Sequence, residues 1–215
     1  KVTGWKECDV LGMEKFDFII PLESRKLLNK DYENLINNND GTKNREIEIL
    51  SKTGEGSTIL WNSSLIEGND GLIIGSVSIG IDITEKRKMI KTLHNLAYYD
   101  PLTNLPNKSL LSDIVNNKIK QIENSDEKLS LVYIDIDNLK HINDTLGHNM
   151  GDEIIKTIAH LINREVKPPH VAGRISGDEF AILYKDVKDS NSVLNEISRI
   201  IKLLRQPIIM DNNEF

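Results

Sequence analysis

The sequence predicts an α+β fold in two parts joined by a helix. In the C-terminal part, amphipathic helical patterns alternate with short apolar runs, and two of these runs, Val171 to Ile175 and Phe180 to Tyr184, flank a tight polar turn. In the N-terminal part, three strand-like runs are separated only by turn sequences. Alternating helices and strands that include an antiparallel hairpin predict a sheet covered by helices.

The first 85 residues predict one helix followed by three antiparallel strands. The helix is expected over Ser24 to Asn37, and the strands over Arg45 to Lys52, Ser57 to Glu67 and Leu72 to Ile81. The connections Thr53-Gly-Glu-Gly56 and Gly68-Asn-Asp-Gly71 have good turn compositions. Trp5 and Trp61 are expected in the core of this part.

A linker helix is expected from Glu85 to Tyr98, with Thr84 as its N-cap. Met89, Leu93 and Leu96 give it an apolar stripe of barely two heptads. Such a stripe suits a linker helix packed on a neighbouring domain, and it also suits a signalling helix that pairs with its copy in a dimer.

The C-terminal part predicts three longer helices around a sheet. The helices are expected over Lys108 to Glu123, Asp152 to Val166 and Ser192 to Arg205, a strand over Leu129 to Ile136, and a strand and turn from Pro207 to Phe215. A short helical stretch that includes Asn143 is expected to lead through a loop bracketed by Gly147 and Gly151 into the second helix.

Composition narrows the class of protein. The chain has 215 residues and a net charge of −6, so nucleic acid is not expected as its main partner. No run is long and apolar enough to span a membrane, and no signal peptide is visible, although an anchor upstream of Lys1 stays open. The single cysteine, Cys8, excludes an internal disulfide and fits a cytoplasmic location.

Carboxylates stand at the ends of two apolar runs. Asp135 and Asp137 end the run that begins at Leu129, and Asp178 and Glu179 lie in the hairpin turn. Each pair alone is compatible with solvated turn residues, but the two pairs converge if the strands are neighbours. Mg²⁺ prefers oxygen ligands of this kind, completed by substrate phosphates and water. The sequence therefore predicts a nucleotide-phosphate site on a sheet.

Between the two pairs lie residues suited to a purine. Asn143 offers a donor and an acceptor, and Asp152 offers acceptors when ionised. Guanine presents a carbonyl acceptor beside N–H donors, so these two side chains suit its edge.

The segment from Asp135 through Asp152, followed by Arg174-Ile-Ser-Gly-Asp-Glu-Phe180, closely resembles the GGDEF diguanylate cyclases. Asp100-Pro-Leu-Thr103 matches the usual opening of that domain. The resemblance covers residues 99–215 and implies a palm-like, ferredoxin-type sheet. It also implies a cyclase that condenses two GTP molecules to cyclic di-GMP and two pyrophosphates across a homodimer.

The resemblance also implies roles for single residues. Asp135 and Asp178 are expected to bind Mg²⁺ or Mn²⁺ through their side chains, and Ile136 through its carbonyl oxygen. Glu179 is expected to assist catalysis with Asp178 near the attacking 3′-hydroxyl. Guanine is expected to contact Asn143 and Asp152. Gly177 would let the backbone approach the phosphates, and Lys140 either faces a phosphate or is an exposed helical lysine; Arg174 and His148 are interpreted as structural supports.

Three departures from the family pattern concern Ser176, Leu139 and the segment before the hairpin. Ser176 replaces the first glycine of the signature and is expected to be tolerated, and Leu139 replaces a more usual phenylalanine. The product-inhibition motif, Arg-x-x-Asp, is represented by Lys167-Pro-Pro-His170, in which neither terminal residue matches. Feedback binding of cyclic di-GMP through this motif is not expected.

Residues 1–85 resemble the C-terminal portion of a PAS sensor domain, including the closing Asp82-Ile-Thr84. Residues 86–98 would then be the signalling linker helix. Only the last three strands of a PAS domain are represented, and the last strands of a cyclase domain are missing, so we expect a fragment with little GTP turnover by itself. The sequence leaves the ligand of the PAS part open.

A second interpretation keeps the family but not the activity. A GGDEF domain with an altered signature can bind GTP without cyclising it and regulate an attached or partner phosphodiesterase (EAL) domain. The formation of product from GTP and Mg²⁺ distinguishes the two interpretations.

Overall fold

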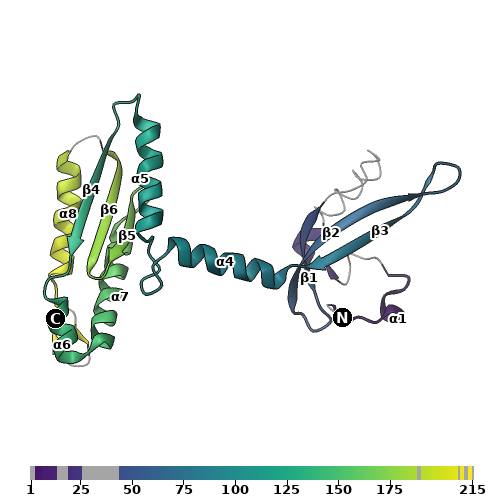
Figure 1. Ribbon diagram of the computed structural model, residues 1–215, viewed down its shortest axis with the longest axis horizontal. Helices are drawn as coiled ribbons and strands as arrows, with labels where there is room; N and C mark the ends of the chain where they lie inside the picture. Colours follow the sequence, from purple (N-terminus) through teal and green to yellow (C-terminus); the bar gives the residue numbers. More distant parts are fainter. Residues whose placement is uncertain are drawn as a thin grey trace. The chain divides into compact units, whose positions relative to one another are not determined.

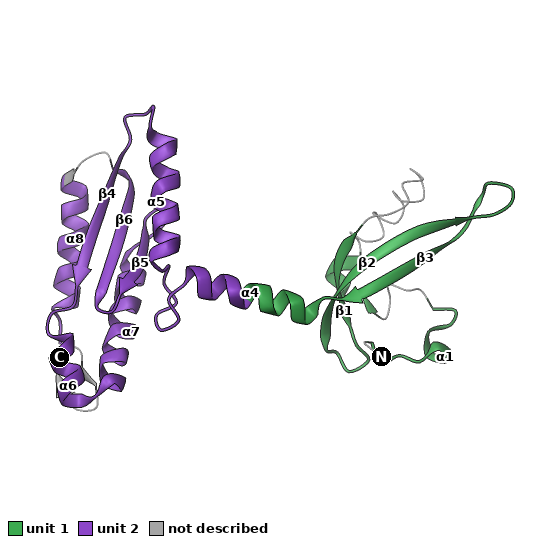
Figure 2. Ribbon diagram, viewed as in Figure 1, with its two compact units in different colours: residues 1–91 green, residues 92–215 purple. Residues whose placement is uncertain are grey.

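The computed structural model describes residues 3–13, 19–25, 44–187, 190–207, 209–210 and 213–214. The chain forms two compact units, residues 1–91 and 92–215 (Figure 2), and helix α4 (Thr84–Tyr98) continues from one into the other. Each unit has a hydrophobic core of its own. The helix expected over Ser24 to Asn37 lies mainly outside the described residues.

The first unit contains the antiparallel meander that the sequence predicts. After the short helix α1 (Glu7–Val10), strands β1 (Arg45–Leu50), β2 (Gly56–Glu67) and β3 (Ile73–Asp82) form one sheet in the order β1-β2-β3 (Figure 1). Ile49 and Ile59 are buried on one face of this sheet. Trp5 and Trp61 pack against them, which confirms their expected place in the core.

Helix α4 begins one residue earlier than expected. The N-cap predicted at Thr84 is wrong, because Thr84 already belongs to the helix and its hydroxyl oxygen accepts a hydrogen bond from Thr58 N on β2 (2.8 Å). Asp82 instead accepts a hydrogen bond from Thr84 N (2.9 Å), and Arg87 forms an ion pair with Glu46 on β1. These contacts fix the start of α4 on the sheet.

The apolar stripe of α4 is exposed. No residue of the helix is buried, and its four large apolar side chains are more than half exposed: Met89, Ile90, Leu93 and Leu96. Exposed apolar surface of this extent is typical of an interaction face.

The second unit alternates helices and strands. Its elements are α5 (Lys108–Ile122), β4 (Lys128–Asp135), α6 (Leu139–Leu146), α7 (His148–Glu165), β5 (Val171–Ser176), β6 (Glu179–Val187), α8 (Ser190–Leu204), β7 (Ile209–Met210) and β8 (Asn213–Glu214). The main sheet is antiparallel in the order β4-β6-β5, and β7 pairs with β8. The connection β4–helix–β5–β6–helix, with β6 between β4 and β5, is that of a ferredoxin-type sheet.

Helices cover both faces of this sheet (Figure 1). Because side chains alternate along a strand, Phe180, Ile182 and Tyr184 of β6 face the core cluster that α7 and α8 contribute to. Ala181 and Leu183 face the other way and pack with Leu111 of α5. The central strand is therefore buried on both faces, which explains its continuous apolar run.

The loop predicted between Gly147 and Gly151 is wrong. Gly147 alone separates α6 from α7, and its φ of +88° lies in the region that favours glycine. Gly151 lies inside the first turns of α7, where a Cβ atom would overlap the side-chain oxygen of Asn143 on α6. Glycine at position 151 therefore allows the two helices to pack closely and does not form a turn. Helix α7 begins at His148, four residues before the predicted Asp152.

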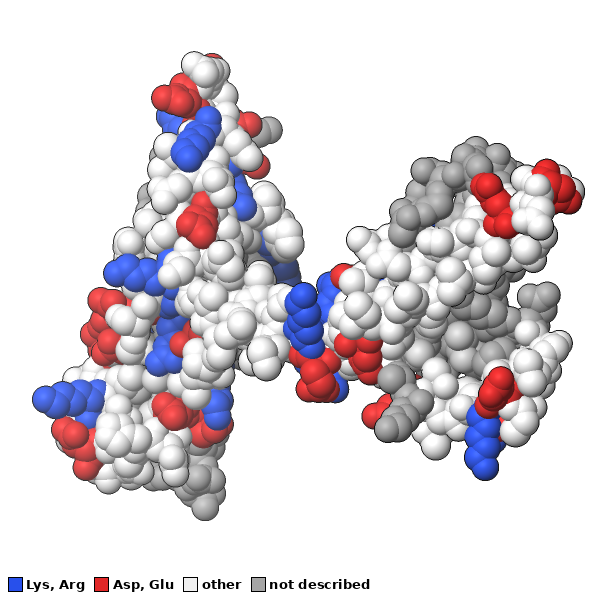
Figure 3. All heavy atoms as spheres, turned by 45° about the vertical axis from the view of Figure 1, so that its right-hand side comes forward, with Lys and Arg blue, Asp and Glu red and all other residues white. Residues whose placement is uncertain are grey.

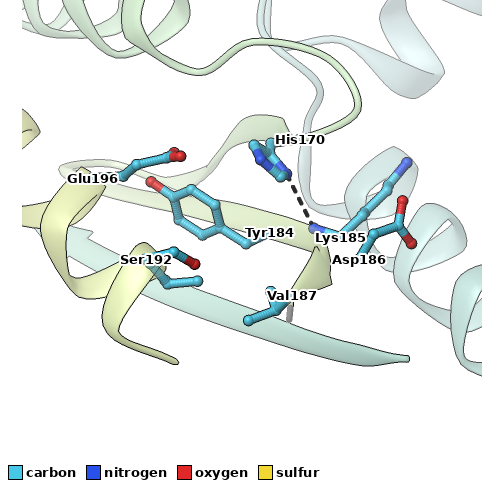
Figure 4. A pocket seen from close by; sticks show the side chains of 8 residues that line it. His170, Tyr184, Lys185, Asp186, Val187, Ser192 and Glu196 are labelled. Carbon is cyan, nitrogen blue, oxygen red and sulfur yellow. Dashed lines mark hydrogen bonds between the residues drawn. The ribbon is translucent and has the colours of Figure 1, made fainter. Parts of the chain in front are cut away.

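A cavity of about 280 Å³ lies at the end of the sheet far from the hairpin turn (Figure 4). The ring of Tyr184 contacts that of His170 with 5.0 Å between centroids, and His170 Nδ1 accepts a hydrogen bond from Lys185 N (3.2 Å). The hydroxyl of Tyr184 points towards the side of Glu196 in Figure 4 but is buried without a hydrogen-bond partner among the described residues. Burial and then the charge of Glu196 raise the pKa of Tyr184 to about 12.

Removing this hydroxyl is expected to stabilise the second unit. A buried donor without a partner costs folding free energy, so Tyr184→Phe should raise the free energy of unfolding by about 1 kcal/mol and the melting temperature by about 3 °C. Thermal and urea unfolding measure both values. Tyr133→Phe, at a side chain that is 68% exposed, is the matched control and should change neither. A destabilised Tyr184→Phe protein would mean that the hydroxyl is satisfied in solution.

Charged side chains of both signs are interspersed on the face shown in Figure 3. In the part of the chain that the structure describes, no helix has the length and apolar character needed to cross a membrane.

Candidate functional site

Three polar side chains line up across the main sheet at the turn between β5 and β6. Asp135 of β4 is the register partner of Glu179 on β6, and Glu179 is in turn the partner of Ser176 on β5. Residues directly opposite each other share a face of the sheet and have neighbouring Cβ atoms. The sequence-based expectation that the acidic strand ends are neighbours is therefore confirmed.

The turn itself, Ser176 to Glu179, is called the signature turn below. Gly177 and Asp178 are its two central residues, and the φ of +38° at Gly177 favours glycine. Ile136 N donates a hydrogen bond to the carbonyl oxygen of Asp178 (3.2 Å), which fixes the turn beside the end of β4. Phe180, completely buried, anchors the following strand.

The carboxylates around this turn repel one another. The pKa of Asp135 is raised by the loss of water around its carboxyl group and by the negative charges of Asp178, Asp137 and Glu179. Within the described residues, no lysine or arginine forms an ion pair with these four carboxylates. An excess of negative charge without a protein counter-ion favours a bound cation.

The donor set suits Mg²⁺ or Mn²⁺ if oxygens of water or of the substrate complete the coordination. No group of three or more histidine, cysteine, aspartate or glutamate side chains in the described ranges is arranged to hold a metal ion unaided. Mg²⁺, however, usually takes one or two carboxylates together with substrate phosphates and water. Asp135 and Asp178, the two side chains expected to bind the ion, provide that number of carboxylates, and each adds to the negative charge of the site.

Arg174 holds the signature turn to the start of the unit. Its Nε and one terminal nitrogen donate to the carbonyl oxygen of Gly177 (3.0 and 2.7 Å), and its other terminal nitrogen donates to Asp100 (3.0 and 3.2 Å). Asp100 also accepts hydrogen bonds from the backbone and hydroxyl of Thr103 (2.9 and 2.7 Å). Burial by itself would raise the pKa of Asp100, but the hydrogen bonds from Thr103 and Arg174 outweigh it and lower that pKa.

Asn143, one of the two residues expected to read guanine, lies where α6 packs on α7. The side chain of Asn143 lies against Gly151, the residue before Asp152. Asn143 Oδ1 is buried and has no hydrogen-bond partner among the described residues, whereas Asp152 is exposed. Lys140 is exposed in the first turn of α6, and His148 is exposed at the start of α7.

Two contacts of the site are absent from the sequence-based expectations. The sequence identifies Asp100 only as part of an opening motif, and nothing in the sequence pairs it with Arg174, which lies 74 residues away. The sequence predicts only that Ser176 is a tolerated replacement, whereas in the structure its hydroxyl donates to Glu179 Oε2 (2.6 Å). The two-residue turn places residues 176 and 179 opposite each other, so hairpin geometry would have been the signal for this second contact.

Known proteins are similar to this chain in sequence. The family described as diguanylate cyclase, GGDEF domain, matches residues 97–215. The cyclic di-GMP phosphodiesterase PdeR of Escherichia coli is 31% identical over 208 residues, which are 95% of this chain and 30% of PdeR. The probable diguanylate cyclase DgcE of the same organism is 26% identical over 86% of this chain and 17% of its own length.

A solved structure extends the likeness to the fold. The coiled coil and GGDEF domain of DgcB from Caulobacter crescentus, in complex with c-di-GMP, has a TM-score of 0.56 and 26% identity, and covers 61% of this chain and 69% of that one. The chain spans less than a third of the length of the two curated relatives. Because the family match covers more than half of the residues, the chain belongs to the GGDEF family of diguanylate cyclase domains.

Proposed function

We propose that this protein is a diguanylate cyclase that condenses two GTP molecules to one cyclic di-GMP and two pyrophosphates. The observation that carries the proposal is the alignment of Asp135 and Glu179 across the sheet, with Asp178 in the adjoining turn. Family membership and the relatives named as cyclases support it. In each half of the reaction, a bond forms between a 3′-oxygen and the α-phosphorus of the other GTP while the bond to pyrophosphate breaks.

The carboxylates have separate roles in this proposal. Asp135, Asp178 and the carbonyl of Ile136 hold Mg²⁺ or Mn²⁺, and Glu179 lies near the attacking 3′-hydroxyl. When bound, the metal ion lowers the pKa of that hydroxyl and offsets the charge that develops on the phosphate. Gly177 leaves the backbone of the turn open to the phosphates, because no heavy atom beyond its two chain neighbours lies within 4 Å of the position a Cβ would take.

Guanine selection is assigned to the contact between α6 and α7. The unpartnered oxygen of Asn143 supports this role, because a buried acceptor gains most from a ligand donor. Asp152, which follows Gly151 in the chain, offers its carboxylate to the N–H donors of guanine. Lys140 is exposed one turn earlier on α6, and in this proposal it interacts with a phosphate.

We further propose that two copies of the chain act together. One domain binds one GTP in this reaction, so a second domain must face it. The exposed apolar stripe of α4 supports pairing of the two linker helices, and the DgcB structure includes a coiled coil together with its GGDEF domain. Residues 1–85, interpreted as part of a PAS sensor, would then control how the two cyclase domains face each other.

A regulatory role is the second candidate. PdeR, which aligns with 95% of this chain, is named a phosphodiesterase, so a GGDEF unit of this kind can belong to a protein named for the opposite reaction. The unit would then bind GTP and control an attached or partner EAL domain without making product.

The formation of cyclic di-GMP from GTP separates the two candidates. The protein as its gene encodes it is incubated with GTP and Mg²⁺, and the nucleotides are separated by chromatography and identified by mass spectrometry. We expect cyclic di-GMP and pyrophosphate in a 1:2 ratio, and no product from GTP when the metal is removed with EDTA. GTP binding by a dimeric protein without product would contradict the cyclase and favour the regulatory role.

A further inference from the structure

The signature turn of this chain contains a hydrogen bond that a glycine at position 176 could not make. Ser176 Oγ donates to Glu179 Oε2 at 2.6 Å, a distance typical of a strong hydrogen bond between a hydroxyl and a carboxylate. The two residues are exposed register partners on β5 and β6, so the contact needs no distortion of the hairpin. Both side chains are therefore held together at the edge of the site.

Glu179 has an unfavourable neighbour on its other side. Its register partner on β4 is Asp135, another carboxylate of the same row. Like charges on neighbouring strands repel each other, whereas the hydroxyl of Ser176 attracts the carboxylate. Without a metal ion, both forces act in the same direction and place the Glu179 carboxylate towards β5.

We propose that Ser176 is a positioning residue that keeps Glu179 apart from the metal ligands Asp135 and Asp178. The proposal rests on the cyclase function proposed above. A carboxylate held by the serine hydroxyl stays available to the attacking 3′-hydroxyl instead of joining the metal ligands. A cation between Asp135 and Asp178 would otherwise attract Glu179 from the neighbouring position in the row.

Removing the hydroxyl should therefore strengthen metal binding and weaken catalysis. In Ser176→Ala, Glu179 is free to turn towards Asp135, so we expect the Kd for Mn²⁺ to fall about threefold and kcat to fall about fivefold. The KM for GTP should change less than about twofold, because the residues assigned to guanine and phosphate are untouched. Ser176→Thr restores the hydroxyl and should return both values to those of the natural protein.

The test combines a binding measurement with a rate measurement. Electron paramagnetic resonance of free Mn²⁺ gives the metal affinity of the nucleotide-free protein, and cyclic di-GMP formation gives kcat and KM. In a Glu179→Gln background, Ser176→Ala should leave the Mn²⁺ affinity unchanged, because Ser176 is proposed to act through the Glu179 carboxylate.

An unchanged or weaker Mn²⁺ affinity in Ser176→Ala would overturn the proposal, as would a loss of kcat that Ser176→Thr does not restore. If the natural protein makes no cyclic di-GMP, the proposed function fails. The Mn²⁺ measurements in the two backgrounds would still show whether Ser176 holds Glu179 away from the metal.

Discussion

Replacing Asp178 by asparagine is expected to lower the rate of cyclic di-GMP formation about a thousandfold while leaving the protein folded. The substitution keeps the shape of the side chain but removes the charge proposed to hold the metal ion. The hydrogen bond from Ile136 N to the carbonyl oxygen of residue 178 uses the backbone, so it survives the change. The turn should therefore keep its place at the end of β4.

The same substitution is expected to make stability less dependent on pH. Loss of water and then the charge of Asp178 raise the pKa of Asp135 in the folded state above the ordinary value of 3.8. Asp135 therefore contributes stability at low pH, and this contribution is lost as the pH rises from 3.8 through the higher pKa of the folded state. In Asp178→Asn one source of repulsion is gone, and this loss should be smaller. Urea unfolding between pH 3 and pH 7 measures it.

Asp113→Asn is the matched control for both measurements. Asp113 is exposed on α5 and undergoes the same change of charge. It should leave the rate and the pH dependence of stability as they are in the natural protein. An Asp178→Asn protein that keeps full activity would contradict the assignment of Asp178, and one that unfolds would show that its charge serves the fold.

The sequence predicted the acidic turn because its signals are local. Apolar runs on both sides of Gly177 and Asp178 predict a hairpin, and one neighbouring strand then suffices to bring Asp135 close to Glu179. The loop predicted at Gly151 is wrong because the role of this glycine is not a local one. A glycine followed by an aspartate favours a loop when only neighbours in sequence are considered, whereas the role of Gly151 depends on Asn143 of another helix.

Contacts between distant segments are the part that the sequence could not supply. Arg174 donates to the carbonyl oxygen of Gly177, three residues away, and the hairpin predicted from the sequence accounts for this contact. Its partner on the other side, Asp100, is set by how the opening segment packs on β5, where Arg174 N also donates to Pro106 O (2.9 Å). No period or spacing of residue types encodes such packing.

The second large effect is expected from replacing Arg174 by methionine. The side chains of Arg174 and Asp100 are only 11% and 19% exposed, so the change leaves a largely buried carboxylate without its cation and the Gly177 carbonyl without two donors. We expect the free energy of unfolding of the second unit to fall by about 2–3 kcal/mol. Because the signature turn also loses its tether, cyclic di-GMP formation should fall about a hundredfold.

Two comparisons distinguish the loss of the contacts that Arg174 makes with Asp100 and Gly177 from a general loss of positive charge. Arg199→Met removes an arginine that is 61% exposed and pairs with Glu165, and it should cost less than about 0.5 kcal/mol. In an Asp100→Asn background, Arg174→Met should cost less stability than in the natural protein, because its ionic partner is already neutral. Equal costs in the two backgrounds would contradict a coupled pair.

The pH dependence of stability gives an independent check on Arg174. Burial acts to raise the pKa of Asp100, but hydrogen bonds from Thr103 and Arg174 lower it below the ordinary 3.8. A lowered carboxyl pKa contributes stability above its unfolded value that is lost as the pH falls through the folded one. This loss below about pH 4 should be smaller in Arg174→Met, because Arg174 contributes to the lowered pKa of Asp100.

Asn107 also joins the last turn of α4, through Ala97 O (2.9 Å), to the start of α5. Asp100 lies in the segment between these two helices and contacts the signature turn through Arg174. Weakening the Asp100–Arg174 contact should therefore alter both stability and catalysis.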